Sequence, residues 1–166
     1  MTDISKAHVH LIGIGGAGLS AIARVLLEQG TGVSGSDLVM SPVAEALVRD
    51  GALVYEGHDA RHVNGADVVV ASSAIPDENV EIREAEARGI PVLRRPAFLA
   101  RMMEGKRVVA VSGTHGKTTT TAMIATILLA AELDPSFIVG GVVAECDARL
   151  AASMVHQVLI EQSVLG

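Results

Sequence analysis

Two glycine-rich segments constrain the fold of this chain more than any other feature of its sequence. GIGGAG at residues 13–18 and SGTHGKT at residues 112–118 each stand between an apolar, β-rich run and a stretch with helical spacing. A strand that turns through glycines into a helix is a common phosphate-binding arrangement, because backbone amides at the helix start point toward the anion. The sequence therefore predicts two separate phosphate-binding turns.

Strand-like and helix-like segments alternate along the chain. Strands are expected at residues 8–14, 31–37, 52–57, 66–72, 90–95, 106–112 and 136–141, and helices at 17–30, 42–51, 79–89, 96–105 and 117–131. Such alternation, with nearly continuous apolar strands, is typical of a parallel sheet covered by helices on both faces. The pattern restarts near residues 103–106, which predicts an α/β, Rossmann-like domain at 1–104 and the incomplete start of a P-loop domain at 105–166.

Composition excludes several classes of function. The net charge of −6 and an aromatic content of 2% argue against a nucleic-acid-binding surface, which needs clustered basic residues and stacking side chains. No apolar run approaches the roughly 18 to 20 residues that a membrane-spanning helix requires. Cys146 has no second cysteine with which to pair, which fits a reducing compartment. We therefore expect a cytoplasmic protein without membrane or nucleic-acid partners.

The first glycine segment has the spacing GxGxxG. Gly13, Gly15 and Gly18 allow a tight turn and close approach of the backbone to a diphosphate. Asp37 follows Gly18 by 19 residues at the end of the second expected strand, where a carboxylate can accept a hydrogen bond from a ribose hydroxyl. By itself this spacing indicates a nicotinamide or flavin dinucleotide. The alternative is that the glycines only permit a sharp turn and that Asp37 is a solvated strand end or a cap.

The second glycine segment has the ending of a P-loop. Backbone amides around Gly113 and Gly116 would surround phosphate oxygens, Lys117 would add a positive charge, and the Thr118 hydroxyl would bind Mg²⁺. Val111 occupies the position of the usual first glycine, which is a departure from the motif. A solvated Lys117 is the alternative, but a cation at a helix start is unfavourable unless an anion is present.

Taken in order, the segments GIGGAGLSAIA, VSGSD, VVASSAIPDEN, IPVLRR and AVSGTHGKTTTTAMIA resemble the N-terminal half of the Mur ligase family. The similarity covers roughly residues 7–145, and GIGGAGLS favours the alanine-adding branch over a sibling that attaches a preformed peptide. In this family the first glycine loop holds a UDP-sugar and the second holds ATP. The resemblance therefore replaces the dinucleotide with UDP-N-acetylmuramate, since a glycine loop does not distinguish two diphosphates.

The resemblance implies an ATP- and Mg²⁺-dependent ligase of peptidoglycan precursor synthesis that joins L-alanine to UDP-N-acetylmuramate through an acyl phosphate. Phosphoryl transfer of this kind depends mainly on positioning and charge neutralisation. Lys117 would hold the transferred phosphate and Thr118 the magnesium, with His115 shaping the loop or acting only as a spacer. The implied substrate contacts are Gly13, Gly15, Gly16, Gly18, Asp37, Ser72 and Ser73. The implied ATP contacts are Gly113, Thr114, His115, Gly116, Lys117, Thr118 and Thr119.

The C-terminal segment departs from the family. An acidic run is expected in the central domain, but here Glu161 is followed by Gln162, Ser163 and Val164. Glu161 is thus either a metal-linked residue or an ordinary strand-end carboxylate. Residues 147–159 fit either a strand or an amphipathic helix, in which His156 is expected to be a non-ligand.

Roughly 60 residues cannot complete a two-faced α/β domain, so we expect uncovered apolar surface and self-association. We also expect nucleotide binding with little or no ligase turnover. Two alternatives remain, namely a non-catalytic UDP-sugar-binding module and a nicotinamide-dependent oxidoreductase. His58 and His62 flank Asp59 at a spacing that could suggest a metal, but no third ligand is near in sequence, and a loop beside the nucleotide is the preferred interpretation.

Overall fold

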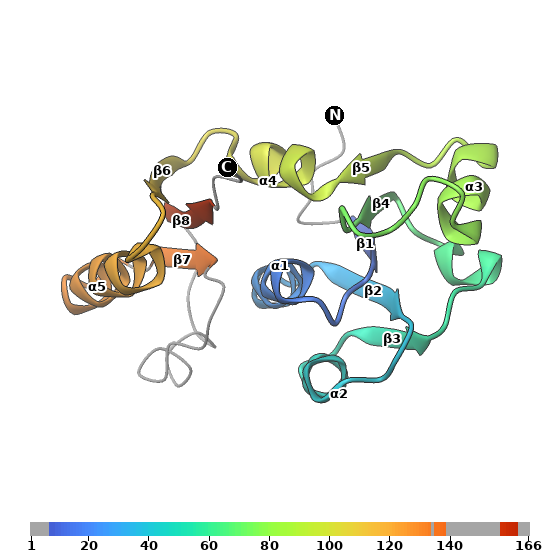
Figure 1. Ribbon diagram of the computed structural model, residues 1–166, viewed down its shortest axis with the longest axis horizontal. Coiled ribbons are helices and arrows are strands. Elements are labelled where there is room, and N and C mark those ends of the chain that lie inside the picture. Colours follow the sequence, from blue (N-terminus) through green and yellow to red (C-terminus); the bar gives the residue numbers. More distant parts are fainter. Residues whose placement is uncertain (1–6, 134, 139–156, 163–166) are drawn as a thin grey trace. The chain divides into compact units, whose positions relative to one another are not determined.

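The computed structural model describes residues 7–133, 135–138 and 157–162 of the 166-residue chain. The chain divides into two compact units, Met1–Met102 and Met103–Gly166. Cys146 and His156 lie outside the described residues. Each unit is a separate body with its own sheet (Figure 1).

The first unit is built on a five-stranded parallel sheet. Its strands are β1 (His8–Ile12), β2 (Gly32–Asp37), β3 (Leu53–Glu56), β4 (Val68–Ala71) and β5 (Val92–Arg94). They lie in the order β3-β2-β1-β4-β5, and every neighbouring pair is parallel. The predicted parallel sheet is therefore confirmed for this unit. The order reverses direction between β1 and β4, which is where doubly wound sheets bind ligands, outside the carboxyl ends of the strands.

Helices lie on both sides of this sheet. In Figure 1, α1 (Ala17–Glu28) and α2 (Pro42–Arg49) lie on one side and α3 (Val80–Ala87) on the other. Successive side chains of a strand point to opposite faces. Ile12 packs into a buried cluster with Val63 and Ile82, so the face of β1 that carries His10 and Ile12 is covered by the 3₁₀ helix η2 (Ala60–Val63) and α3. The other face of β1, with Val9 and Leu11, is equally buried.

Local sequence explains where two of these helices begin. Ser41 accepts a hydrogen bond from the Ala44 amide at 3.2 Å and is followed by Pro42, so α2 starts with a side-chain cap and a proline at its first position. Asn79 caps α3 in the same way by accepting from the Glu81 amide at 2.9 Å. The cap places Glu81 in the first turn of α3, where the helix dipole favours a carboxylate.

Close contact between β1 and β2 requires a glycine at position 35. A Cβ atom there would lie 2.5 Å from the carbonyl oxygen of Leu11 and 2.7 Å from the Ile14 Cδ1 atom. No side chain can occupy that space without displacing backbone. The missing side chain therefore lets the strand that ends in Asp37 approach the glycine turn after β1.

The second unit contains a three-stranded parallel sheet and one long helix among its described residues. The strands β6 (Arg107–Ser112), β7 (Pro135–Ile138) and β8 (Gln157–Gln162) lie in the order β6-β8-β7, and α5 spans Lys117–Ala130. For the part of residues 147–159 that is described, the structure decides in favour of a strand. Val108, Val109, Met123 and Ile127 are exposed, which is consistent with uncovered apolar surface; self-association remains a prediction.

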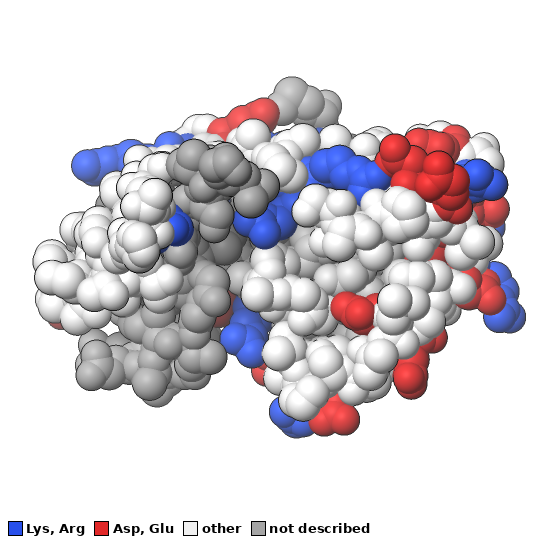
Figure 2. All heavy atoms as spheres, in the orientation of Figure 1, with Lys and Arg blue, Asp and Glu red and all other residues white. Residues whose placement is uncertain are grey.

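The helix α4 (Arg95–Met103) follows β5 directly and contributes Phe98, Leu99 and Met102 to the buried residues. No helix in the described ranges is both long and apolar enough to cross a membrane. On the face drawn in Figure 2, the largest group of acidic side chains adjoins basic ones, and the other charged side chains stand in smaller groups on uncharged surface.

Candidate functional site

The first glycine turn lies at the point where the strand order reverses. Gly13 follows β1, Ser72 follows β4, and the Ser72 amide donates to the Ile12 carbonyl at 3.1 Å. A Cβ atom on Gly13 would lie 3.2 Å from the Cβ of Ser72, and Gly13 has a positive φ of 87°. The ends of β1 and β4 thus meet around a glycine that other residues would replace only with strain.

Hydrogen bonds fix the shape of this turn. The amides of Gly13 and Ile14 both donate to the Ser36 carbonyl, at 2.8 and 3.1 Å, and the Gly16 amide donates to the Gly13 carbonyl at 3.1 Å. Gly16 is the N-cap of α1 and provides no capping side chain. The amides of Ala17 and Gly18 that follow have no acceptor within the helix, as is usual for a first turn. These two donors are the ones the turn can offer to an anion.

Asp37 belongs to the same turn. Its Oδ2 atom accepts from the Gly15 amide at 2.8 Å, and its Oδ1 atom accepts from the Leu38 amide at 2.8 Å. A Cβ atom on Gly15 would lie 2.9 Å from Oδ2, so the contact requires a glycine. Each carboxylate oxygen retains acceptor capacity after one hydrogen bond. Asp37 therefore holds the glycine turn and can still accept from a ligand hydroxyl.

Two arginines that the sequence interpretation did not single out border the turn. Arg95 covers Gly18 so closely that a Cβ atom there would collide with its guanidinium group. A guanidinium beside a helix start is electrostatically unfavourable unless an anion lies between them. Arg94 donates to the carbonyls of Ser72 and Ile75 at 3.0 and 2.8 Å and pairs with Asp77. The Arg-Arg pair at the end of the fifth strand was the available sequence signal.

The remaining predicted substrate residues are placed differently from one another. Ser72 is partly buried beside Gly13, and its hydroxyl accepts from the Ala74 amide at 3.4 Å. Ser73 is exposed in the loop after β4. The structure thus brings the glycines, Asp37 and Ser72 together at one edge of the sheet, with Ser73 on the adjoining loop.

The second glycine segment also lies between a strand and a helix. It connects β6 to α5, with Gly116 in a left-handed conformation (φ 75°) as the N-cap and no side-chain cap. Lys117 donates from Nζ to the Gly113 carbonyl at 2.7 Å and to the Thr114 carbonyl at 3.5 Å. The ammonium group is therefore held over the loop. This donor set, a lysine and the uncapped start of a helix, fits a phosphate group.

Glu161 is located by strand register. β8 pairs in parallel with β6, and the register sets Glu161 opposite Val111 and Gln162 opposite Ser112. Parallel strands end at the same edge of a sheet, so Glu161 lies at the edge from which the second glycine segment emerges. His115 is exposed on that segment, and Thr119 is exposed in the first turn of α5.

His58 and His62 are brought to a buried carboxylate rather than to a metal site. His62 Nδ1 lies 2.7 Å from Glu81 Oε1, and His58 Nδ1 lies 3.5 Å from Glu81 Oε2. Across the part of the chain that is described, no group of three or more His, Cys, Asp or Glu side chains is arranged to hold a metal ion. Sequence spacing could not find Glu81, which lies 19 residues beyond His62.

Comparison with known proteins identifies the family. The model of the Mur ligase family, catalytic domain, matches residues 8–107, which is most of the first unit. The chain belongs to the Mur ligase family. The resemblance noted from the sequence motifs is thereby confirmed.

Relatives within the Mur ligase family match this chain over most of its length. A UDP-N-acetylmuramate–L-alanine ligase of Roseiflexus sp. (strain RS-1) is 54% identical over 134 residues, covering 81% of this chain and 29% of the relative. That of Koribacter versatilis (strain Ellin345) is 50% identical over 153 residues, covering 92% and 33%. The chain thus spans about a third of the length of these relatives.

Solved structures of Mur ligases have the same fold as this chain. The UDP-N-acetylmuramate–alanine ligase of Thermotoga maritima superposes with a TM-score of 0.84 at 30% identity, covering 95% of this chain and 37% of that one. A UDP-N-acetylmuramate:L-alanyl-γ-D-glutamyl-meso-diaminopimelate ligase from Neisseria meningitides gives a TM-score of 0.81 at 32% identity, covering 94% and 52%. Both the alanine-adding and the peptide-adding branches are therefore structurally similar to this member.

Proposed function

We propose that this chain provides the UDP-sugar-binding unit, and the beginning of the ATP-binding unit, of a ligase that joins L-alanine to UDP-N-acetylmuramate. The observation that carries the proposal is the glycine turn between β1 and α1 at the reversal of strand order, in a chain about half identical to alanine-adding ligases. The amides of Ala17 and Gly18 and the Arg95 guanidinium would bind the diphosphate. Asp37 would accept from a hydroxyl at the ribose or uracil end of the nucleotide, and Ser72 and Ser73 would lie beside the sugar.

The second unit would hold ATP and Mg²⁺. Lys117 would bind the transferred phosphate, Thr118 would bind the magnesium ion, and Glu161 stands at the same sheet edge. Bound ATP supplies the phosphoryl group that turns the lactyl carboxylate of the sugar into an acyl phosphate, a far better acyl donor than a carboxylate. The amine of L-alanine then attacks the acyl carbon, phosphate departs, and the nitrogen loses a proton. The chain's residues position charges in such a reaction.

Calorimetric titration tests the sugar-nucleotide site directly. UDP-N-acetylmuramate should bind one site per chain, and Gly15→Ala should weaken binding about tenfold because the added Cβ displaces Asp37 from the turn. Gly32→Ala, also in the first unit but without a positive φ and with its nearest atom 3.7 Å from the added Cβ, controls for a general glycine effect. Saturable binding of NADH with no binding of UDP-N-acetylmuramate would replace the proposal with the dinucleotide alternative.

A further inference from the structure

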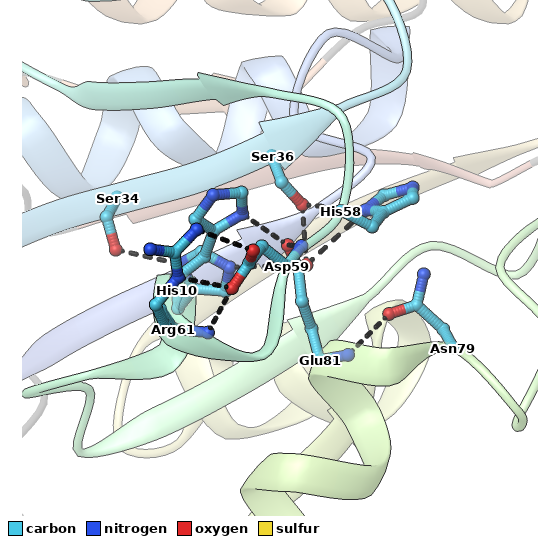
Figure 3. A network of polar contacts seen from close by, with 9 residues as sticks. His10, Ser34, Ser36, His58, Asp59, Arg61, Asn79 and Glu81 are labelled. Carbon is cyan, nitrogen blue, oxygen red and sulfur yellow. Dashed lines mark hydrogen bonds and ion pairs between the residues drawn. The ribbon is translucent and has the colours of Figure 1, made fainter.

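A buried carboxylate stands at the centre of a polar cluster on the face of the sheet covered by α3. Glu81 is 0% exposed. Its Oε2 atom accepts from the Ser36 hydroxyl at 2.6 Å, and its Oε1 atom lies 2.7 Å from His62 Nδ1 and accepts from the Asp59 amide at 3.3 Å. Figure 3 shows His10 of β1, Ser36 of β2 and His58, before η2, directed toward Glu81 at the start of α3.

Histidines provide the rest of the cluster. His10 is fully buried, with Nε2 at 3.5 Å from Glu81 Oε2 and Nδ1 at 2.8 Å from the Ser34 hydroxyl. The Ser34 hydroxyl also lies 2.8 Å from His8 Nε2, and His58 Nδ1 lies 3.1 Å from the Ser36 hydroxyl. Tyr55 stacks on His62 with ring centroids 4.1 Å apart.

One assignment of protons is consistent with all the hydrogen bonds of this cluster. An ionised carboxylate only accepts hydrogen bonds, so Ser36, His62 and the Asp59 amide must all donate to Glu81. His10 then carries its proton on Nε2, facing Glu81, and its Nδ1 accepts from Ser34, whose oxygen in turn accepts from His8. His58 donates from Nδ1 toward Ser36. The hydrogen bonds from Ser36, His62 and the Asp59 amide end on Glu81, and His10 Nε2 faces its Oε2 atom at 3.5 Å without a hydrogen bond, so the negative charge of Glu81 is the common centre of the cluster.

Ser36 connects this cluster to the glycine turn. Its side chain donates to Glu81, and its backbone carbonyl accepts from the amides of Gly13 and Ile14 at 2.8 and 3.1 Å. Ser36 is itself 0% exposed and is the residue before Asp37, which holds the Gly15 amide. A shift of Ser36 would therefore move the acceptors of three consecutive amides of the turn.

We infer that Glu81 is a positioning residue for sugar-nucleotide binding: through the Ser36 side chain it fixes the carbonyl and the neighbouring Asp37 that hold the glycine turn after β1. The inference rests on the proposed function. Because Glu81 is fully buried, it does this without touching the ligand. The same carboxylate also ties His62 and the Asp59 amide to the strands, so the segment after β3 is held beside the end of β2.

The ionised state of Glu81 supports this role. Burial acts to raise the pKa of Glu81, but the proximity of His10 and the hydrogen bonds from Ser36 and His62 outweigh it and lower the pKa to about 2. The acceptor is therefore charged at neutral pH. Hydrogen bonds to a charged acceptor are stronger than neutral ones, which makes the link to Ser36 a firm one.

Calorimetry on the full chain separates positioning from simple structural support. The probe is UDP-N-acetylmuramate, at a temperature where the fluorescence of Tyr55 shows each variant to be folded. Glu81→Gln and Ser36→Ala should each weaken binding of this ligand about tenfold, because each lowers the fraction of molecules in which the glycine turn after β1 has its binding conformation. The double variant should be no weaker than either single one, because both changes break the same link. Glu86→Gln, an exposed glutamate on the same helix, is the matched control.

Amide hydrogen exchange tests the inference without the ligand. In Glu81→Gln the amides of Gly13 and Ile14 should exchange about tenfold faster, while those in the middle of α1 keep their rates. Unchanged exchange at Gly13 and Ile14, or additive losses of affinity in the double variant, would overturn the inference. If the wild-type chain fails to bind UDP-N-acetylmuramate, the proposed function fails, and exchange still decides whether Glu81 positions the turn. If Glu81→Gln does not fold, Ser36→Ala supplies both measurements.

Discussion

Replacing Glu81 by glutamine should destabilise the first unit by an amount that depends on pH. The substitution keeps the size of the side chain and removes its charge, so it imitates the protonated acid. Ser36 and His62 would then donate to a neutral group or face an amide NH₂ that cannot accept. The loss should therefore be large where the wild-type carboxylate is ionised and small where it is protonated.

The magnitude follows from the pKa of Glu81, which the fold lowers from 4.5 to about 2. The unfolded chain binds the proton more readily than the folded chain between these values, so ionisation adds stability that is fully present above pH 4.5 and disappears as the pH falls toward 2. At about 1.4 kcal/mol per pKa unit, the contribution at pH 7 is on the order of 3 kcal/mol. By pH 3 it should fall to less than half of that amount.

Urea unfolding followed by the fluorescence of Tyr55 measures this effect. Tyr55 is the only tyrosine, the chain has no tryptophan, and the ring stacks on His62 within the cluster. The signal therefore reports the first unit and not the second. Glu86→Gln, on the same helix but exposed, should change the free energy of unfolding by less than about 0.5 kcal/mol at either pH.

The decisive quantity is the difference in unfolding free energy between wild type and Glu81→Gln at several pH values. It should shrink steadily as the pH is lowered from 5 to 3. A difference that stays constant over this range would show that packing, and not the charge of Glu81, accounts for the loss. A difference near zero at pH 7 would refute the buried ionised carboxylate itself.

Three further outcomes test other parts of the structure. In the same urea assay, Gly35→Ala should lower the free energy of unfolding by about 1 to 3 kcal/mol because its Cβ meets the Leu11 carbonyl at 2.5 Å. Gly32→Ala on the same strand, with the nearest atom 3.7 Å from its Cβ, should be neutral or slightly stabilising. Lys117→Ala should weaken Mg·ATP binding about tenfold or more in calorimetry, while Lys106→Ala, at the opposite end of β6, should leave binding unchanged. Equal losses of Mg·ATP affinity in the two variants would argue against the second phosphate site. Arg95→Ala should weaken UDP-N-acetylmuramate binding about tenfold, with a smaller loss at high salt, whereas Arg88→Ala at the end of α3 should have no effect. If Arg95→Ala binds the sugar nucleotide as tightly as the wild type, Arg95 is not part of the diphosphate site.

Much of the first unit could be predicted from the sequence because its signals are local. Apolar β-rich runs, helical spacing and glycines at strand ends act over a few residues, and the strands and helices expected between residues 8 and 105 are present with ends shifted by a few residues. The glycine turn after β1 followed from spacing alone. The ligand of this turn could not be predicted from the spacing, because a turn of backbone amides binds any diphosphate. Only the combined motifs of the family favoured a UDP-sugar.

Tertiary structure alone decided how distant side chains are used. Asp37 was expected at a ribose, but the fold also makes it the acceptor of the Gly15 amide. For His58 and His62 the sequence favoured a loop beside the nucleotide over a metal site, and it gave no sign of Glu81. Folding brings both histidines to Glu81, on a helix that no local pattern connects with them. Local patterns specify which segments become strands and helices, since those choices depend on neighbouring residues. The partners of a buried charge depend on which strands pair and which helix covers them, and sequence distance carries no information about that.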